Sequence, residues 1–179
     1  DPHYTVVSSA EPVSPPPPAP ALVIQGHPAW LANDASSSWL GPVNPGELSV
    51  AAGNYRYATR FDLSGFDPAT AALAINVAAD NRLNDILLNG VSRKLGFEGF
   101  TGFSPAFPVK TGFTSGLNTL EFLWANDGDG ANPAGFRAVL KGTAKSLAVA
   151  ESRLSPVRPA AYFRRQFVFE GNPASRQLR

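Results

Sequence analysis

The chain has 179 residues, including 17 prolines and 16 glycines, and it carries a net charge of +1. This length fits one domain with tails. The chain has no cysteine and only two histidines, which excludes disulfides, thiol catalysis, iron–sulfur clusters, cysteine-bound zinc and a three-histidine metal site within one chain. Charged residues make up only 16% of the chain, and with so much glycine, proline and phenylalanine this composition is typical of an all-β protein.

Residues 1–20 form a proline-rich segment. Four consecutive prolines occur at Pro15, Pro16, Pro17 and Pro18. Such a run favours polyproline II and is incompatible with a helix or a central strand. We therefore expect an extended N-terminal arm, which serves either as a stiff spacer or as a docking segment held by the domain or by a partner.

Between residues 21 and 145, short apolar stretches alternate with turn residues. A period of two over residues 55–63 and again over residues 73–77 predicts half-buried strands. The pair Asn89-Gly90 is the strongest two-residue hairpin signal, and further strands are predicted over residues 117–124 and 136–140. This spacing of strands and turns predicts an antiparallel, jelly-roll-like β-sandwich over residues 21–145.

Residues 146–179 form a basic extension. Residues 151–179 contain six arginines and two glutamates, whereas residues 1–150 contain nine basic and twelve acidic residues. A short helix is predicted over residues 145–154. The strand-like stretch around Arg164 and Arg165 echoes residues 57–73, which predicts either the start of a truncated second repeat or a strand that pairs with the sandwich or with a neighbouring chain.

The uneven charge bears on the choice of partner. A basic face that covers the whole protein is not indicated, so no nucleic-acid partner is expected. Arg164 and Arg165 are candidate contacts for a protein partner, and the alternative is that they are solvated arginines on a terminal strand.

Several segments taken together resemble a known type of bacterial protein. They are Ser38-Trp39-Leu40, Phe61-Asp62-Leu63-Ser64-Gly65-Phe66-Asp67-Pro68, Asn84-Asp85-Ile86-Leu87-Leu88-Asn89-Gly90, Gly116-Leu117-Asn118-Thr119-Leu120-Glu121-Phe122 and Asn132-Pro133-Ala134-Gly135-Phe136-Arg137. Over about residues 29–144 the chain is similar to the galactose-binding-domain-like β-sandwich of exported bacterial proteins, many of which bear PEP-CTERM sorting tails. The resemblance implies a sandwich that binds sugars, binds proteins or spaces other parts.

The chain contains no run of about 20 apolar residues, so no transmembrane segment is expected. It begins Asp1-Pro2-His3 and contains no methionine, and we therefore expect either a processed protein or a trimmed chain. Cleavage of an export signal would explain this start and predicts a periplasmic, cell-surface or extracellular location.

The stretch from residue 126 to residue 132 concentrates oxygen-bearing side chains between two predicted strands. Hard cations such as calcium take six to eight oxygen ligands. Asp127, Asp129 and Asn132 are therefore candidate ligands of a structural calcium, which modules of the type that this chain resembles often carry. The spacing is not that of an EF-hand, and Asp and Asn also favour plain turns, so both interpretations stay open.

A polar stretch over residues 80–85 is interpreted as a loop before a strand and as a candidate sugar site. Amide, guanidinium and carboxylate groups bind sugar hydroxyls, and an exposed tryptophan supplies a face for stacking. Trp39 and Trp124 are expected to pack in the core, which leaves Trp30 as the platform. The predicted sugar-binding residues are Trp30, Asn81, Arg82, Asn84 and Asp85.

Three phenylalanines, Phe97, Phe100 and Phe103, lie in a glycine-rich stretch. Exposed apolar patches mark interfaces, so these side chains are candidate partner contacts together with the four prolines. The alternative is that they fold back as a lid on the sandwich core.

No catalytic pattern accompanies these sites. His27 lies in a turn, and the chain has no G-x-S-x-G elbow and no glycine-rich phosphate loop followed by a helix. We predict a non-catalytic, exported structural or interaction subunit that binds protein partners through its terminal arms in a homo- or hetero-oligomeric assembly. The alternative is a carbohydrate-binding module that recognises a glycan through the polar loop and an exposed tryptophan.

Overall fold

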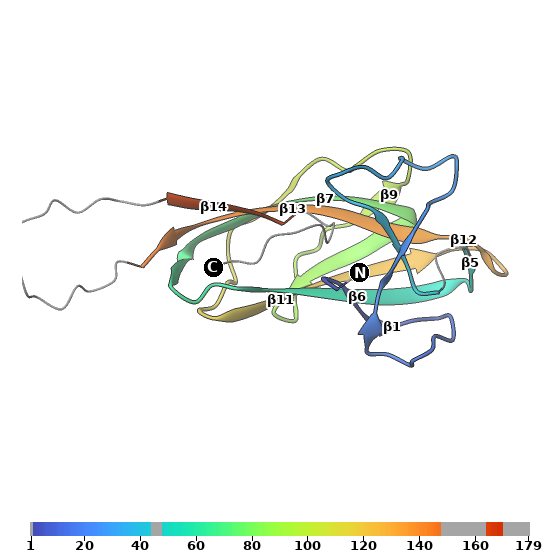
Figure 1. The fold of residues 1–179 in the computed structure, drawn as a ribbon, viewed down its shortest axis with the longest axis horizontal. Helices are drawn as coiled ribbons and strands as arrows, with labels where there is room; N and C mark the ends of the chain where they lie inside the picture. Colours follow the sequence, from blue (N-terminus) through green and yellow to red (C-terminus); the bar gives the residue numbers. More distant parts are fainter. Residues whose placement is uncertain (1, 44–47, 148–163, 170–179) are drawn as a thin grey trace, which may run out of the picture.

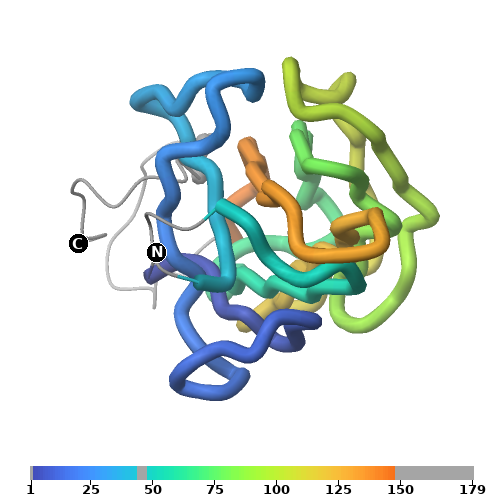
Figure 2. Tube along the Cα trace, turned by 90° about the vertical axis from the view of Figure 1, so that its right-hand side faces the viewer, coloured from blue at the N-terminus to red at the C-terminus, as the bar shows by residue number. Residues whose placement is uncertain are grey.

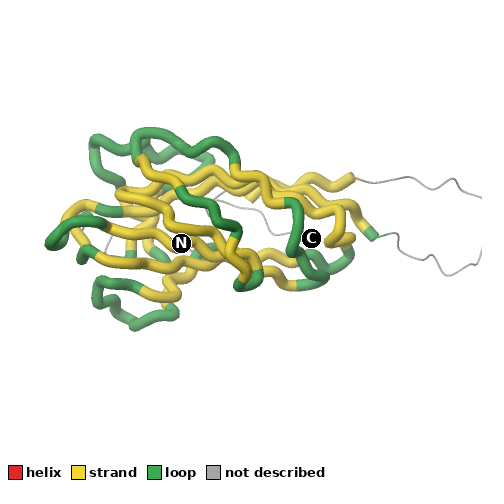
Figure 3. Tube along the Cα trace, turned by 180° about the vertical axis from the view of Figure 1, so that it is seen from behind, coloured by secondary structure: helices red, strands yellow, loops and turns green. Residues whose placement is uncertain are grey.

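The computed structural model describes residues 2–43 and 48–147, together with the backbone of residues 164–169 (Figure 1). Within these ranges the chain forms strands, turns and loops and no helix (Figure 3). All strand pairs are antiparallel, and two layers of strands enclose a hydrophobic core. The predicted all-β sandwich is therefore confirmed.

The first layer runs in the order β2-β1-β6-β11-β7. Its central pair, β6 and β11, is in register from Leu117 opposite Asp62 to Asn126 opposite Gly53. The strands of this layer are β1 (Thr5–Ser8), β2 (Ala19–Pro20), β6 (Gly53–Asp62), β11 (Leu117–Asn126), the second part of β7 (Phe66–Leu88), β8 (Val91–Ser92) and β9 (Phe97–Gly99).

The second layer runs in the order β10-β7-β13-β4-β3, and β14 pairs with β13. Its strands are β3 (Leu22–Ile24), β4 (Trp39–Gly41), the first part of β7, β10 (Phe107–Val109), β13 (Gly135–Ser146) and β14 (Arg164–Phe169). A separate two-stranded sheet pairs β5 (Ser49–Val50) with β12 (Asn132–Pro133). The layers thus share one long strand, β7.

Strand β7 has 23 residues and changes its partner midway. Residues 66–80 pair with β13, and residues 82–88 pair with β11. The change falls at Asp80-Asn81, whose peptide bond is cis. The prediction that residues 80–85 form a loop before a strand is therefore wrong, because these polar residues occupy a corner inside β7.

The core is built from alternate residues of the facing strands. Phe136 of β13 lies against Phe122 and Trp124 of β11, with ring centroids 4.8 Å and 6.5 Å apart. Tyr55 stacks on Trp124 at 4.3 Å. Burial of each such large side chain contributes roughly 1.5–3 kcal/mol. The expectation that Trp124 packs in the core is confirmed.

The first twenty residues are part of the sandwich rather than a separate arm. Strand β1 pairs with both β2 and β6, and the side chains of Tyr4 and Val6 are buried in the core. The domain boundary predicted after residue 20 is therefore not seen, and the domain itself holds this segment. Pro15, Pro16 and Pro18 are exposed and Pro17 is half-buried, and their contact with a partner stays a prediction.

The hairpin predicted at Asn89-Gly90 is confirmed. Leu88 pairs with Val91, and the two turn residues have φ angles of 53° and 78°. Positive φ at both central positions is what the favoured two-residue hairpin turn requires.

At the other end of the chain, β14 extends the second layer. Arg164 lies opposite Lys145 and Arg165 opposite Ala144 in the register with β13. Lys145 and Ser146 belong to β13, so the helix predicted over residues 145–154 is wrong at its start. Residues 148–154 lie outside the described residues. Contact of the two arginines with a partner stays a prediction.

A second hydrophobic cluster covers the outer face of the second layer. Ile24, Trp30, Trp39 and Ala78 form it, and Phe100 and Phe103 pack against it. Phe97 packs against the main core. The three phenylalanines are half-buried, as the lid interpretation expects. Contact of a partner with the exposed parts of these three side chains stays a prediction.

Candidate binding site

Two open pockets lie at the end of the sandwich where β11 ends and β13 begins. We call this the loop end; Figure 2 looks onto it, with the orange stretch between β11 and β13 near the centre. The first, the Arg82 pocket, has a volume of about 320 Å³ and is lined by Ala52, Gly53, Asn54, Arg82, Ala125, Asn126, Asp127 and Gly128. The second, the Asp80 pocket, has a volume of about 300 Å³ and is lined by His27, Ala29, Trp30, Asp80, Asn81, Phe100, Asn132 and Pro133.

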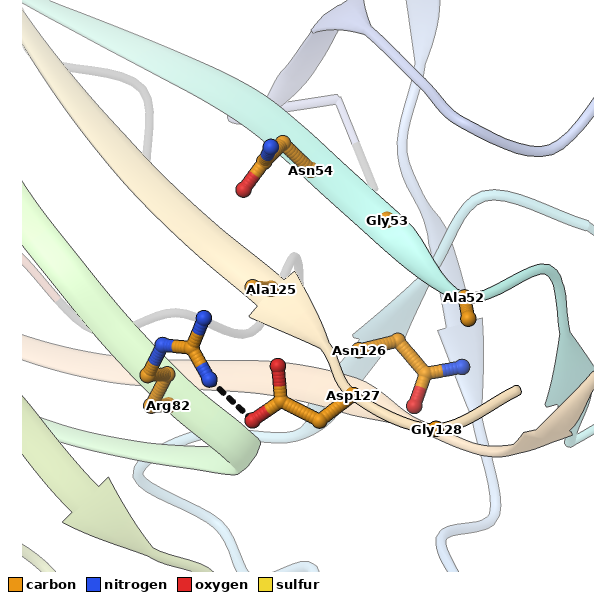
Figure 4. A pocket seen from close by; sticks show the side chains of 8 residues that line it. All are labelled: Ala52, Gly53, Asn54, Arg82, Ala125, Asn126, Asp127 and Gly128. Atoms are coloured by element: carbon orange, nitrogen blue, oxygen red, sulfur yellow. Dashed lines mark hydrogen bonds and ion pairs between the residues drawn. The ribbon is translucent and has the colours of Figure 1, made fainter. Parts of the chain in front are cut away.

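A row of polar side chains crosses three strands at the Arg82 pocket. Arg82 on β7 forms an ion pair with Asp127, which follows β11, and Figure 4 shows the two side chains pointing toward each other. Arg82 also donates to Asn84 Oδ1 at 2.9 Å, and Asn84 donates to Asn54 Oδ1 on β6 at 3.4 Å. The side chains of Arg82 and Asp127 are 38% and 44% exposed, so both reach solvent.

Three amides shape the loop that separates the two pockets. Asn81 Oδ1 accepts a hydrogen bond from the Asp127 backbone N–H at 2.6 Å. Asn132 Nδ2 donates to the carbonyl oxygens of Asp127 and Gly130 at 2.9 Å and 3.1 Å. Asn126 Nδ2 donates to the Val50 carbonyl at 2.8 Å. The position of Asp127 is therefore fixed from both sides.

The N-terminal segment supports the floor of the Arg82 pocket. Glu11 Oε2 accepts a hydrogen bond from the Ala51 N–H at 2.6 Å. Gly53 has a φ of +143°, and a Cβ added there would lie 2.6 Å from Ala10 Cβ. Only glycine fits at this position, because L side chains avoid such a φ and the N-terminal chain passes too close. This role of residues 10 and 11 was not predicted from the sequence.

The Asp80 pocket is built around a buried carboxylate. Asp80 is 8% exposed, and its Oδ2 accepts a hydrogen bond from Trp30 Nε1 at 2.8 Å. Burial raises the pKa of Asp80 above its ordinary value, although the Trp30 hydrogen bond and the nearby His27 act in the opposite direction. Nothing in the local sequence around Asp80 indicated this environment.

Trp30 is not the exposed platform that was predicted. It is only 6% exposed, because its ring packs on Trp39 at 4.6 Å and its N–H is bound by Asp80. A buried indole that satisfies its N–H in this way is part of the wall of the pocket. The other apolar faces at the pocket come from His27, Phe100 and Pro133. Trp39 packs in the protein interior, as expected, but in the second hydrophobic cluster rather than in the main core.

Arg137 holds the segment that carries His27 and Trp30. It projects from the outer face of β13, is fully buried, and donates to Ser37 Oγ at 2.7 Å and to the Ala32 carbonyl at 2.6 Å. It also forms an ion pair with Asp34 at 2.9 Å and lies 5.0 Å from the Phe103 ring centroid. Arg137 was not predicted from the sequence as a site residue. Its place next to Phe136 in a strand implies the opposite face, but a strand pattern does not show that a loop covers that face.

The structure brings together most of the predicted sugar-binding residues, but not all. Trp30 and Asn81 line the Asp80 pocket, whereas Arg82 lines the other pocket and binds Asn84. Asp85 lines neither pocket. Its oxygens accept hydrogen bonds from the Ile86 and Leu95 N–H groups and from Ser92. Burial alone would raise the pKa of Asp85, but these hydrogen bonds outweigh it, and the pKa is lowered.

The predicted calcium ligands have other partners. Asp127 is paired with Arg82, and Asn132 turns its amide nitrogen toward the loop carbonyls. Asp129 is exposed. Within the described residues, no group of three or more acidic or imidazole side chains forms. A structural calcium at this loop therefore stays a prediction.

Comparison with known proteins gives two structural similarities. No protein-family model matches the chain, and no curated protein matches it. The structure of a CBM35 from Paenibacillus barcinonensis shares 14% sequence identity over 76% of this chain and 96% of that chain, with a TM-score of 0.35. The PA14 domain of the antifreeze protein MpAFP shares 12% identity over 94% of this chain and 85% of that chain, with a TM-score of 0.33.

The described part of the chain contains no helix with the length and hydrophobicity that a membrane crossing requires.

Proposed function

We propose that this protein is a non-catalytic glycan-binding module whose site is the loop end of the sandwich. One observation supports this proposal above others: hydrogen-bonding side chains from separate strands and loops converge there and leave both pockets open. They are Asn54, Asp80, Asn81, Arg82, Asn84, Asp127 and Asn132.

The chemistry of these groups suits a ring that carries many hydroxyls. A sugar hydroxyl both donates and accepts hydrogen bonds, and Arg82 with Asp127 offers a donor and an acceptor side by side on partly exposed side chains. Pocket volumes of about 320 and 300 Å³ lie at the small end of the range for ligand sites. Each pocket therefore suits about one sugar ring.

The placement of the carboxylates favours binding over hydrolysis. Glycoside hydrolysis commonly uses a pair of carboxylates on either side of the scissile bond. Among the described residues, Asp127 is the only carboxylate that lines the Arg82 pocket, and Asp80 is the only one that lines its own pocket. A single carboxylate in each pocket serves as a hydrogen-bond acceptor.

Isothermal titration of the full chain with glycans selected on an array tests the proposal. We expect Arg82→Ala to weaken binding of the selected glycan by at least tenfold, because it removes the main donor of its pocket. Arg60→Ala is the matched control, since Arg60 is an exposed arginine of β6 that lies opposite Thr119, toward the other end of the sandwich. Failure of every glycan to bind, or equal binding by the two variants, would contradict the proposal.

We also propose that the protein is a structural subunit of a larger assembly. In this assembly, β14 of one copy pairs with the sandwich of a neighbouring copy. Pairing of β14 with residues 140–145 of β13 supports it, because β4 pairs with β13 only at Phe136 and leaves the rest of that edge to a β14 strand, from the same chain or from a neighbouring copy. Edge strands readily pair with other chains. Under this second proposal, the protein is exported and assembles outside the cytoplasm.

Engineered cysteines test the second proposal, because the chain has none of its own. Thr143 lies opposite Gln166 in the register of β13 and β14, at a spacing that a disulfide spans. Two chains, one with Thr143→Cys and the other with Gln166→Cys, are mixed and oxidised. A disulfide-linked heterodimer is expected from exchange between copies, and its absence would show that β14 stays on its own sandwich. A double variant that closes the bond within one chain is the control.

A further inference from the structure

Asp80 is a buried carboxylate with few partners. It accepts one hydrogen bond, from Trp30 Nε1 to Oδ2, and Oδ1 accepts none from a described residue. Asp80 is also absent from the three ion pairs that the described residues form. Buried carboxylates are costly unless they are paired or fully hydrogen-bonded. Asp80 lines the pocket, and its Oδ1 has no donor among the described residues, so a ligand can supply one.

Among the described residues, no lysine or arginine is paired with Asp80. No lysine or arginine lines the Asp80 pocket. Arg82, two residues further along β7, is bound to Asp127 and Asn84 and lines the other pocket. Arg137, on β13 beside β7, is paired with Asp34. His27 is the titratable group that faces Asp80 inside the pocket.

The other walls suit a cation of moderate size. Trp30 and Phe100 present aromatic groups to the pocket, and aromatic rings attract an ammonium group. Asn132 donates through Nδ2 to the loop, and its Oδ1 accepts no hydrogen bond from a described residue. An ammonium group has three donors and no acceptor, and the oxygens that Asp80 and Asn132 bring to the pocket lining are acceptors for it.

We propose that the Asp80 pocket binds the protonated amino group of an amino sugar, which forms a charge-assisted hydrogen bond with the Asp80 carboxylate. The inference rests on the proposed glycan-binding function and names the class of sugar. Charge-assisted hydrogen bonds are about twice as strong as neutral ones. In the N-acetylated form of the same sugar, the nitrogen is neutral and carries an additional acetyl group. We therefore expect the N-acetylated sugar to bind the Asp80 pocket less tightly than the free amine.

The test compares two oligosaccharides on the full chain by isothermal titration. One is a β-1,4-linked glucosamine oligomer at a pH where its amines are protonated, and the other is the N-acetylated oligomer of the same length. We expect the glucosamine oligomer to bind at least tenfold more tightly. Equal binding, or tighter binding of the acetylated oligomer, would overturn the inference.

Two carboxamide variants locate the effect. Asp80→Asn keeps an acceptor for the Trp30 N–H but removes the charge, and it should abolish the preference for the free amine. Asp129→Asn removes an exposed carboxylate from the same end of the molecule and should retain the preference, which separates the pocket from general attraction of a polycation. A preference that survives Asp80→Asn would also overturn the inference.

The outcomes separate the two proposals. If neutral glycans bind in an Arg82-dependent manner and the free amine gives no advantage, the glycan-binding function stands and the amino-sugar inference fails. If no oligosaccharide binds at all, both fail. Thermal unfolding of Asp80→Asn is measured alongside, and should that variant fold poorly, the comparison of the two oligosaccharides on the unaltered chain still decides.

Discussion

Two asparagines on one strand show how differently the two ends of the sandwich use the same side chain. Asn118 is the second residue of β11 and Asn126 is the last, so they lie at opposite ends of the molecule (Figure 1). They are 0% and 2% exposed. Their burial is nearly equal, and the difference between them lies in their hydrogen bonds.

At the end opposite the loop end, every hydrogen-bonding position of Asn118 is used. Its Oδ1 accepts from Asn89 Nδ2 at 2.8 Å and from the Thr114 N–H at 2.9 Å. Its Nδ2 donates to the carbonyls of Thr114 and Gly116, both at 2.8 Å. This network ties the Asn89 hairpin to the turn before β11, and it leaves no capacity for a ligand.

At the loop end, Asn126 uses only its nitrogen. Nδ2 donates to carbonyl oxygens of the neighbouring loop, whereas Oδ1 is buried without a hydrogen bond from any described residue. Asp80 at the same end also has one oxygen that accepts no hydrogen bond from a described residue. The two asparagines therefore differ in what their substitution removes, which is a complete set of hydrogen bonds at Asn118 and an incomplete one at Asn126.

Asn118→Ala should have the largest effect on stability. It leaves the Thr114 N–H and the Thr114 carbonyl without this partner, and it removes one of two partners from Asn89 Nδ2 and from the Gly116 carbonyl. Buried groups left unpaired cost about 1–3 kcal/mol each before relaxation. We expect the free energy of unfolding to fall by about 3–4 kcal/mol, measured by urea titration. A loss below about 1 kcal/mol would show that water replaces the network and would remove the contrast between the two ends.

Asn126→Ala should cost less, about 1 kcal/mol, although the side chain is equally buried. The change removes the bond to the Val50 carbonyl but also removes an oxygen that has no partner. The same urea titration measures it beside the first variant. Equal losses for the two variants would mean that burial, and not hydrogen-bond satisfaction, sets the cost.

Asp34 should give the smallest effect, and one that depends on pH. The Ser36 hydroxyl, two backbone N–H groups and Arg137 lower the pKa of Asp34 from 3.8 to about 2. Because the folded pKa is lowered, its stabilisation is present above about pH 4 and is lost as pH falls toward 2. The side chain is 53% exposed, so we expect less than about 1 kcal/mol.

Unfolding of the wild type and of Asp34→Asn, measured at pH 5 and at pH 2.5, checks this expectation. The difference between the two proteins should shrink at the lower pH, where the carboxylate is largely protonated in the unfolded chain. A constant difference would show that Asp34 contributes no pH-dependent stability to the loop end.

Patterns within a few residues of each other were enough to predict much of the scaffold. The period of two in β6 and β7, the Asn89-Gly90 turn and the buried Trp124 follow from local chemistry, because a strand with one buried face must alternate and a tight hairpin needs positive φ. The polar stretch from residue 80 to residue 85 also pointed to the loop end, since Asn81, Arg82 and Asn84 lie there.

The errors have a common physical origin. Trp30 was expected to be exposed, but Asp80, fifty residues away in the chain, accepts its N–H. Residues 1–20 were expected to form an arm, but β6 takes β1 as a neighbour. In each case the deciding partner is distant in sequence, so no local pattern indicates it.

By itself, the sequence of this protein determined an antiparallel all-β sandwich, the places of its main strands and turns, and the excluded chemistries, since these depend on composition and on the alternation of neighbouring residues. Only the tertiary structure decided that β7 turns a corner at Asp80, that Arg137 is buried under a loop, and that the polar residues divide between two pockets. Burial and hydrogen-bond satisfaction are properties of groups brought together by long-range strand pairing, and they decide which of many similar asparagines and aspartates are available to a ligand.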